Sequence, residues 1–287
     1  MSALRIKEAH LAGRWYPAEP DVLAATVRGL LAAAPPPRPH VVAIVVPHAA
    51  YEYSGATAAR GFATACSPGR QRAVVLAPSH YASFRGAAVL AVDSYRTPLG
   101  LVTIDAAGVA ELARAALVRM NLAVFMREHA LEIQLPLLQT LLPGRSVVPL
   151  LIGDLETGDA AALAELLRSL LRPEDLLIVS SDMTHYGRRF DYLPFPSADA
   201  PTVAAAIRRL DEGALDRMVA ADAEGFARYV AQTGATICGR NPIEVLLRAL
   251  PPGVRGERIA YATSLEVNGD PGHVVSYAAI AFAALAA

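Results

Sequence analysis

Residues 41–55, VVAIVVPHAAYEYSG, constrain the fold more than any other part of the sequence. The segment begins with apolar, mostly β-branched residues and no charge, which is typical of a strand covered on both faces. Pro47 lacks the N–H that a sheet ladder needs, so we expect the strand to end there and His48 to lie just past its carboxyl end. A buried strand of this kind predicts a mixed α/β fold.

Three further segments follow the same plan, an apolar run that ends in polar residues. They are residues 73–81 (AVVLAPSHY), 147–154 (VVPLLIGD) and 176–187 (LLIVSSDMTHYG). In an open α/β sheet, ligands bind in the crevice beyond the carboxyl ends of the strands. We therefore expect one site to gather His48, His80, Asp182 and His185.

Composition and charge exclude several classes of protein. The 287 residues are 54% hydrophobic and 18% charged, with a formal net charge of −1 and no long run of either sign, so nothing indicates a nucleic-acid binder. Cys66 and Cys238 are too few for a disulfide framework and are consistent with a reducing compartment, although a single bridge stays open. The first twenty residues lack the apolar core of a signal peptide, and the apolar C-terminal stretch falls short of the ~20 residues that span a bilayer. We expect a cytoplasmic protein that does not cross a membrane.

Strand and helix patterns alternate along most of the chain, which favours a sheet with helices on both faces. We find no internal repeat and no linker, so the sequence predicts one domain. The expected strands are 41–46, 72–77, 86–97, 147–152, 176–180, 259–264 and 273–282; the expected helices are 21–34, 55–66, 106–118, 127–142, 158–171, 202–210, 224–232 and one that begins after Cys238.

Two histidines at strand ends and a cysteine from a late loop could form a three-ligand metal site. Imidazole suits iron, zinc and copper, whereas thiolate shifts the preference toward softer ions, so the ligand types leave the metal open. Asp182 and His185 could form an acid–base pair in which the carboxylate orients the imidazole. A serine nucleophile at Ser180 or Ser181 is the rival interpretation, but no GxSxG elbow supports it.

The segment EHALE, residues 128–132, resembles a zinc-protease motif only superficially, because it has one histidine where that motif needs two. Glu128 and Glu132 share a helix face, with His129 beside it. Three roles stay open for these residues: a carboxylate that supports a metal ligand, a general base, or part of a solvated helix face. Cys238 precedes the expected start of a helix, a place that favours thiolate, although a role as a small buried hydrophobic residue is the equal alternative. Cys66, in an alanine-rich segment, is expected to be inert core.

Nine blocks of sequence occur in this order along the chain: KEAHLAGRWYP, PHAAYEYSG, APSHY, YRTPLG, EHALEIQLPLL, VVPLLIGD, SSDMTHYGRRF, TICGRNPIEVLL and VVSYAAIAF. Together they resemble the Memo-like family, which is named for a mediator of cell motility and is called protein B of the AmmeMemoRadiSam system in prokaryotes. The resemblance implies a single domain over residues 1–287 with an α/β sandwich, similar to the class III extradiol dioxygenases of the LigB-like group. One departure is Ala50, where the family usually has glycine, and a position that needed positive φ or a close ligand would be affected by the added methyl group.

The resemblance also implies a site. It places metal ligands at His48, His80 and Cys238, and further pocket residues at Asp182, His185 and Glu132. We expect Fe(II), with copper or zinc as alternatives, and an oxidative or redox step on a small molecule in which His185 is the acid or base and Asp182 orients it. Partners implied by the resemblance are AMME-type and radical S-adenosylmethionine proteins. The alternative function is an adaptor without turnover that chelates copper or iron or binds a peptide; a serine or zinc hydrolase is the weakest candidate.

Overall fold

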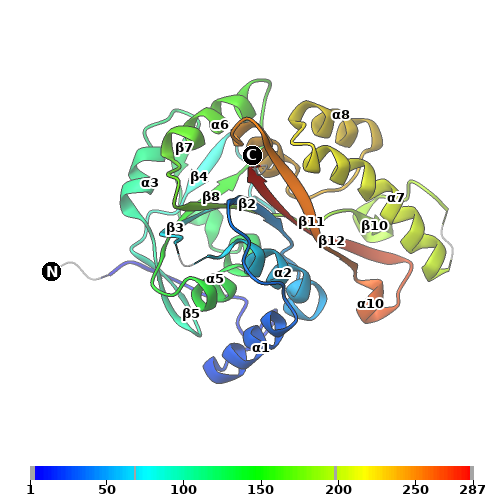
Figure 1. The fold of residues 1–287 in the computed structure, drawn as a ribbon, viewed down its shortest axis with the longest axis horizontal. Coiled ribbons are helices and arrows are strands. Elements are labelled where there is room, and N and C mark those ends of the chain that lie inside the picture. The colour runs from blue at the N-terminus through cyan, green and yellow to red at the C-terminus, as the bar shows by residue number, and fades with distance from the viewer. Residues whose placement is uncertain (1–3, 68, 197–198, 285–287) are drawn as a thin grey trace.

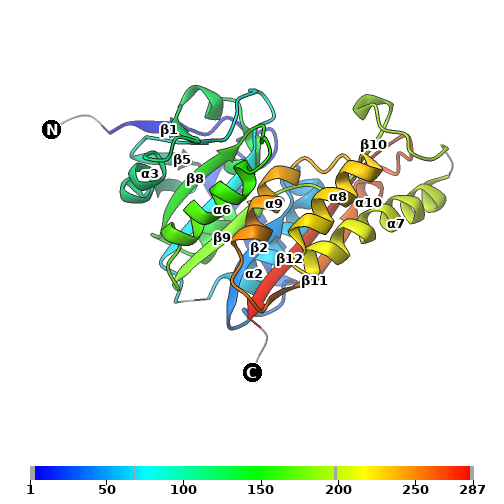
Figure 2. The ribbon, with the colours of Figure 1, turned by 90° about the horizontal axis from the view of Figure 1, so that it is seen from above.

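The structure is a computed structural model that describes residues 4–67, 69–196 and 199–284. A large mixed sheet crosses the molecule and is flanked by helices, as Figures 1 and 2 show. The α/β sandwich expected from the sequence is confirmed. One large hydrophobic core runs from Leu11 to Phe282 and is centred on the strands of this sheet, many of whose side chains are fully buried.

The large sheet has the strand order β10-β12-β2-β9-β3-β8-β4-β7, and β11 pairs with β12 outside this path. The strands are β2 (Val41–Val46), β3 (Arg72–Pro78), β4 (Ala87–Val89), β7 (Val118–Met120), β8 (Ser146–Ile152), β9 (Asp175–Ser180), β10 (His185–Gly187), β11 (Val254–Thr263) and β12 (His273–Ala284). The central neighbours β2, β9, β3 and β8 are mutually parallel. Their carboxyl ends therefore meet at one edge, which is where the sequence predicts the site.

A smaller sheet joins β1 (Ile6–Glu8), β5 (Ser94–Thr97) and β6 (Gly100–Thr103). The single strand expected over residues 86–97 is therefore wrong, because β4 belongs to the large sheet and β5 to the small one. The chain changes sheets at Asp93, whose backbone N–H donates to the carbonyl of Arg5 at 2.9 Å and whose carboxylate accepts from the N–H of Arg5 at 2.7 Å. Pairing with the N-terminal segment thus replaces continuation of the strand.

The helices are α1 (Pro20–Ala32), α2 (Ala56–Ala65), α3 (Ala106–Leu112), α4 (His129–Glu132), α5 (Leu135–Leu141), α6 (Asp159–Leu170), α7 (Ala200–Val219), α8 (Ala223–Thr233), α9 (Arg240–Ala249) and α10 (Leu265–Asn268). α2 packs on β2 and β12, and α9 packs on β3 and β9 as well as on α6. Within the described ranges, no helix is both long and apolar enough to cross a membrane.

Three expected helices differ from the structure. The helix predicted over residues 127–142 is broken into α4 and α5, because Pro136 has no N–H to donate to Glu132 and its ring would clash with that carbonyl. The helix predicted over residues 106–118 ends at Leu112, since Val118 pairs in β7. The helix predicted over residues 202–210 continues to Val219.

Candidate metal site

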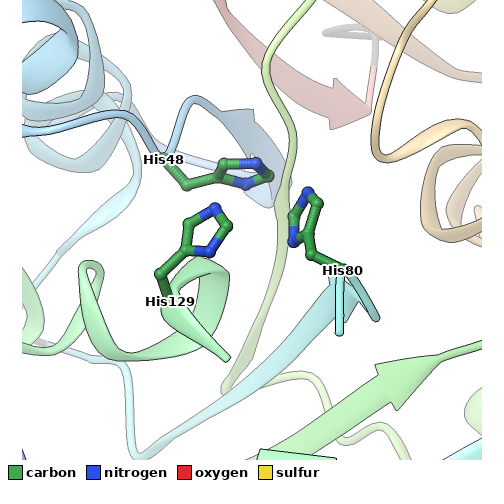
Figure 3. A group of neighbouring side chains, drawn as sticks. All are labelled: His48, His80 and His129. Carbon is green, nitrogen blue, oxygen red and sulfur yellow. The ribbon is translucent and has the colours of Figure 1, made fainter. Parts of the chain in front are cut away.

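Three histidines from three different segments converge at the carboxyl edge of the sheet (Figure 3). His48 follows β2, His80 follows β3, and His129 is the first residue of α4. Each offers one ligand nitrogen, and these nitrogens all lie within 4.8 Å of one another. The sequence predicted the meeting of His48 and His80 from their strand ends, and the structure brings them together with ring centroids 5.1 Å apart.

His48 is 2% exposed, and its hydrogen bonds determine which ring nitrogen carries the proton. The hydroxyl of Ser180 donates to the carbonyl of Ala130 at 2.6 Å, so its oxygen accepts from Nδ1 of His48 at 2.9 Å. The lone pair of the neutral ring is then on Nε2. Burial, the largest cause, lowers the pKa of His48 well below its ordinary value, which keeps the imidazole neutral. Ser180 is thereby occupied as a support for His48. The hydroxyl of Ser181 donates to the carbonyl of Asp182 at 2.7 Å, so neither serine is positioned as a nucleophile activated by His185.

Glu128 orients His80. Its carboxylate accepts from Nδ1 of His80 at 2.9 Å and from the backbone N–H groups of His80 at 2.7 Å and Ala130 at 3.0 Å. Burial alone would raise the pKa of Glu128, but the hydrogen bonds and charge of His80 outweigh it and lower the pKa. Because Nδ1 donates to the carboxylate, Nε2 of His80 is left with the lone pair. The solvated helix face considered for Glu128 is wrong, since the residue is 1% exposed.

His129 completes the cluster, and the sequence did not single it out as a ligand. Its ring stacks on His80 at a centroid distance of 4.4 Å and packs against Trp15 at 4.6 Å. Burial, followed by the charge of His80, lowers the pKa of His129 to about 4. In the sequence, the position of His129 directly after Glu128 was the one sign that it could belong to the site. The division of this segment into α4 and α5, which begins α4 at His129, is visible only in the structure.

Cys238 lies beside the ring of His48. Its Sγ is 3.2 Å from Nε2 of His48 and accepts from the backbone N–H of Asp182 at 3.2 Å. Burial, followed by the charge of Asp182, raises the pKa of this thiol, so the thiolate expected from the helix start is disfavoured in the protein without a cation. Cys66 is buried and Cys238 is half-buried; both are free, so the two form no bridge.

Asp182 and His185 lie in the same region but are held separately. The carboxylate of Asp182 accepts from the backbone N–H of His48 at 2.8 Å. Nδ1 of His185 lies 3.0 Å from the carbonyls of Met183 and Thr236, which can only accept, so Nδ1 carries the proton and Nε2 is free. Backbone carbonyls therefore perform the orienting task that the sequence assigned to Asp182. Burial raises the pKa of Asp182.

Glu132 is fully buried and binds the N-terminal segment. Its carboxylate accepts from the hydroxyls of Tyr16 and Tyr95, each at 2.7 Å, and from the backbone N–H of Leu11 at 2.8 Å. Burial, together with the charge of Glu132, raises the pKa of both tyrosines, so both remain donors. These contacts hold Trp15 near His129, and the catalytic role expected for Glu132 stays a prediction.

Ala50 has a φ of −54°, which any residue adopts. The possibility that this position needs positive φ is therefore wrong, and the methyl group introduces no backbone strain.

The donor set fits a metal ion. Nδ1 of His48 and of His80 is engaged by Ser180 and Glu128, which presents each Nε2 lone pair as a ligand. His129 adds a third imidazole. The sulfur of Cys238 lies 3.2 Å from Nε2 of His48 but outside this group of three mutually close donors. Neutral imidazoles with one thiol suit divalent iron, zinc or copper and do not suit magnesium or calcium, which prefer oxygen.

Comparisons with known proteins agree over most of the chain. The family described as Memo-like protein matches residues 7–281. The Protein MEMO1 of Xenopus tropicalis is 32% identical over 269 residues, which cover 92% of this chain and 86% of the relative. The human Protein MEMO1 is 32% identical over 250 residues, covering 85% and 84%, and the memo-1 homolog of Caenorhabditis elegans is 31% identical over 247 residues, covering 85% and 71%.

A solved structure shares the fold. It is the crystal structure of the uncharacterized protein JW3007 from Escherichia coli K12, which superposes with a TM-score of 0.51 over 83% of this chain and 98% of that one. The sequences are 14% identical, so the likeness concerns the fold alone.

Proposed function

Because the chain belongs to the Memo-like family, we propose that it binds one metal ion, Fe(II), and carries out a redox step on a small molecule. The observation that supports this most is the convergence of His48, His80 and His129, with Cys238 3.2 Å from His48. In this proposal His48, His80 and Cys238 hold the ion, and His129 is a fourth donor within reach.

The chain's own residues would do the remaining work. A bound iron would supply redox chemistry and open positions for a chelating substrate. His185, with its proton fixed on Nδ1, would accept a proton from a substrate hydroxyl at Nε2. Asp182 would keep the backbone of His48 in place through the 2.8 Å hydrogen bond. Trp15 would shield His129 from water.

Metal content of anaerobically purified protein tests the proposal. We expect about one equivalent of Fe(II) per chain in competition with Cu(I) and Zn(II), since one set of ligands serves one ion. His48→Ala and His80→Ala should abolish binding, because each removes an imidazole that the neighbouring residues orient. His40→Asn, an exposed histidine outside the site, is the control.

Absorption spectroscopy tests whether the thiolate of Cys238 is a metal ligand. Co(II)-loaded protein should show thiolate-to-metal charge-transfer absorption that Cys238→Ser abolishes, whereas Cys66→Ser and His129→Gln should retain it. A Co(II)-loaded wild type without the band, together with loss of Co(II) binding in His129→Gln, would instead make the three imidazoles the ligand set. Full Fe(II) binding by both His48→Ala and Cys238→Ser would sink the metal proposal.

A binding protein without turnover is the second candidate, and the surface beside His129 favours it. Tyr81, with 52% exposure, lies with its hydroxyl 3.3 Å from Nδ1 of His129 and under the guanidinium of Arg127, and Met126 is 50% exposed. Exposed aromatic and apolar groups of this kind are typical of contact surfaces. A stable partner lost in Tyr81→Ala, together with unaltered metal binding, would support this candidate.

A further inference from the structure

A cavity lies beside the segment that follows β10, at the end of the molecule that carries β10, α7 and α10 in Figure 2. Its volume is about 640 Å³, enough for a small organic molecule. It is lined by Arg188, Arg189, Asp270, Gly272, His273 and the apolar run of residues 193–196, LPFP. Two arginines against one carboxylate make the lining cationic, and neither arginine takes part in the metal-site contacts described above.

The walls of the cavity are firmly held. The ring of Phe195 stacks on the fully buried Tyr186 at 4.6 Å. Tyr192 donates its hydroxyl to the carbonyl of Thr233 at 2.9 Å. Gly187, at φ 126°, lies so close to the carbonyl of Gly272 that a Cβ there would collide with it. A cavity fixed in this way needs little rearrangement to bind a ligand.

A series of ring contacts leads from the cavity to His185. His273 stacks on Phe190 at a centroid distance of 4.5 Å, and Phe190 meets the ring of His185 edge-on at 4.9 Å. His185 follows Asp182, the residue whose carboxylate holds the backbone of His48, by three positions, and its Nδ1 lies 3.0 Å from the carbonyl of Thr236, two residues before Cys238. His185 therefore links the cavity side of the molecule to the segments that carry the metal-site residues. Nδ1 of His273 is also buried without a hydrogen-bond partner among the described residues, which leaves a polar atom at the cavity wall to be satisfied.

We propose that this cavity binds the anionic end, a carboxylate or phosphate group, of the small molecule that the metal site acts on. That the bound molecule also reaches the metal site rests on the proposed function, whereas anion binding by the cavity does not. Arginine recognises both groups through paired, charge-assisted N–H···O bonds, and residues 193–196 would cover an apolar or aromatic part of the molecule. The substrate class is therefore an amphipathic acid whose other end reaches His185 and the metal ligands.

Benzoate, its neutral analogue benzamide and inorganic phosphate are the probes, titrated calorimetrically into the full chain. We expect the wild type to bind at least one of the two anions. For that anion, Arg188→Gln/Arg189→Gln should weaken binding about tenfold or more, the loss typical of charged hydrogen bonds. The matched control is Arg114→Gln/Arg119→Gln, which removes the same charge from exposed residues near β7 at the opposite end of the sheet and should bind as the wild type does.

The two anions distinguish the two sources: tighter binding of phosphate assigns a phosphate ligand, and tighter binding of benzoate a carboxylate. Any of three results would overturn the proposal. The first is that neither anion binds saturably, and the second is that the wild type and the Arg188/Arg189 double variant bind the anion equally well. The third applies if benzoate is the anion that binds, and is that benzamide binds as tightly as benzoate.

The link to the metal needs its own measurement. Protons of the bound anion, or the phosphorus of phosphate, should relax faster in Co(II)-loaded than in Zn(II)-loaded protein, and the Arg188/Arg189 double variant should lose this effect. Equal relaxation with both metals would overturn the link. If the wild type binds no metal while anion binding still depends on the arginines, the proposed function fails and the anion pocket stands.

Discussion

A single side chain, Glu128, connects two of the clustered histidines. It caps α4 through the N–H of Ala130 and holds both the backbone and the ring of His80. One buried carboxylate therefore serves three donors, and its negative charge increases the basicity of the His80 ring as a ligand.

Glu128→Gln should weaken metal binding about 10- to 100-fold, the usual cost of losing a carboxylate that orients a ligating histidine. The amide keeps the shape of the side chain but brings an NH₂ group toward the N–H donors that the carboxylate accepts. Competitive metal titration gives the affinity. Glu174→Gln, an exposed glutamate before β9, is the matched control and should change nothing. An affinity in Glu128→Gln equal to that of the wild type would contradict this role.

At the scale of elements, the segment before α9 places Cys238 by close packing. Gly239 lies against the side chain of Ser181, which follows β9, and its N–H donates to the Ser181 hydroxyl at 3.0 Å. A Cβ at position 239 would overlap this side chain, so the contact requires glycine. The neighbouring sulfur thereby reaches both His48 and the N–H of Asp182.

Gly239→Ala should displace this segment from β9 and destabilise the fold by about 1–3 kcal/mol, the typical cost of overpacking. The Co(II) charge-transfer band of Cys238 should weaken in the same variant. Gly29→Ala, in α1 with open space around the new methyl group, is the control, and its stability should stay equal or rise. Urea unfolding and absorption of the Co(II) protein measure the two effects. Wild-type values for both in Gly239→Ala would rule out this close packing.

At the scale of the whole molecule, burying neutral histidines makes stability depend on pH. The pKa of His129 is about 4 in the folded protein against an ordinary value of 6.5, so the unfolded chain binds more protons between these values. The stabilisation associated with neutral His129 is therefore present above about pH 6.5 and is lost as the pH falls toward 4.

The metal-free wild type should lose more stability than metal-free His129→Gln between pH 7 and pH 4, by about 3 kcal/mol at most, since each pKa unit corresponds to about 1.4 kcal/mol. Denaturant unfolding of both proteins across this range gives the difference. His40→Gln, which changes an exposed histidine, should follow the wild type. Parallel stability curves for the wild type and His129→Gln would show that His129 is not buried in the neutral form.

The sequence alone determined the α/β class, the central parallel strands and the approach of His48 to His80. These features depend on short stretches of sequence, because a buried strand is a run of apolar residues and parallel strands bring their carboxyl ends to one edge of the sheet. The prediction of one strand over residues 86–97 is wrong because the second half of this segment pairs with the N-terminal segment. That contact joins residues 88 positions apart in the chain.

Only the tertiary structure decided the rest of the site. His129 and Glu128 enter it because the chain breaks before Pro136 and α4 packs on β3. Glu132 is directed toward Tyr16 and Tyr95 instead, and the ring of His185 is held by carbonyls that carry no side-chain signature. The cationic cavity likewise combines Arg188 and His273 across β10 and β12. Each of these contacts joins segments far apart in the chain, so their distances and directions depend on packing, which local sequence patterns do not encode.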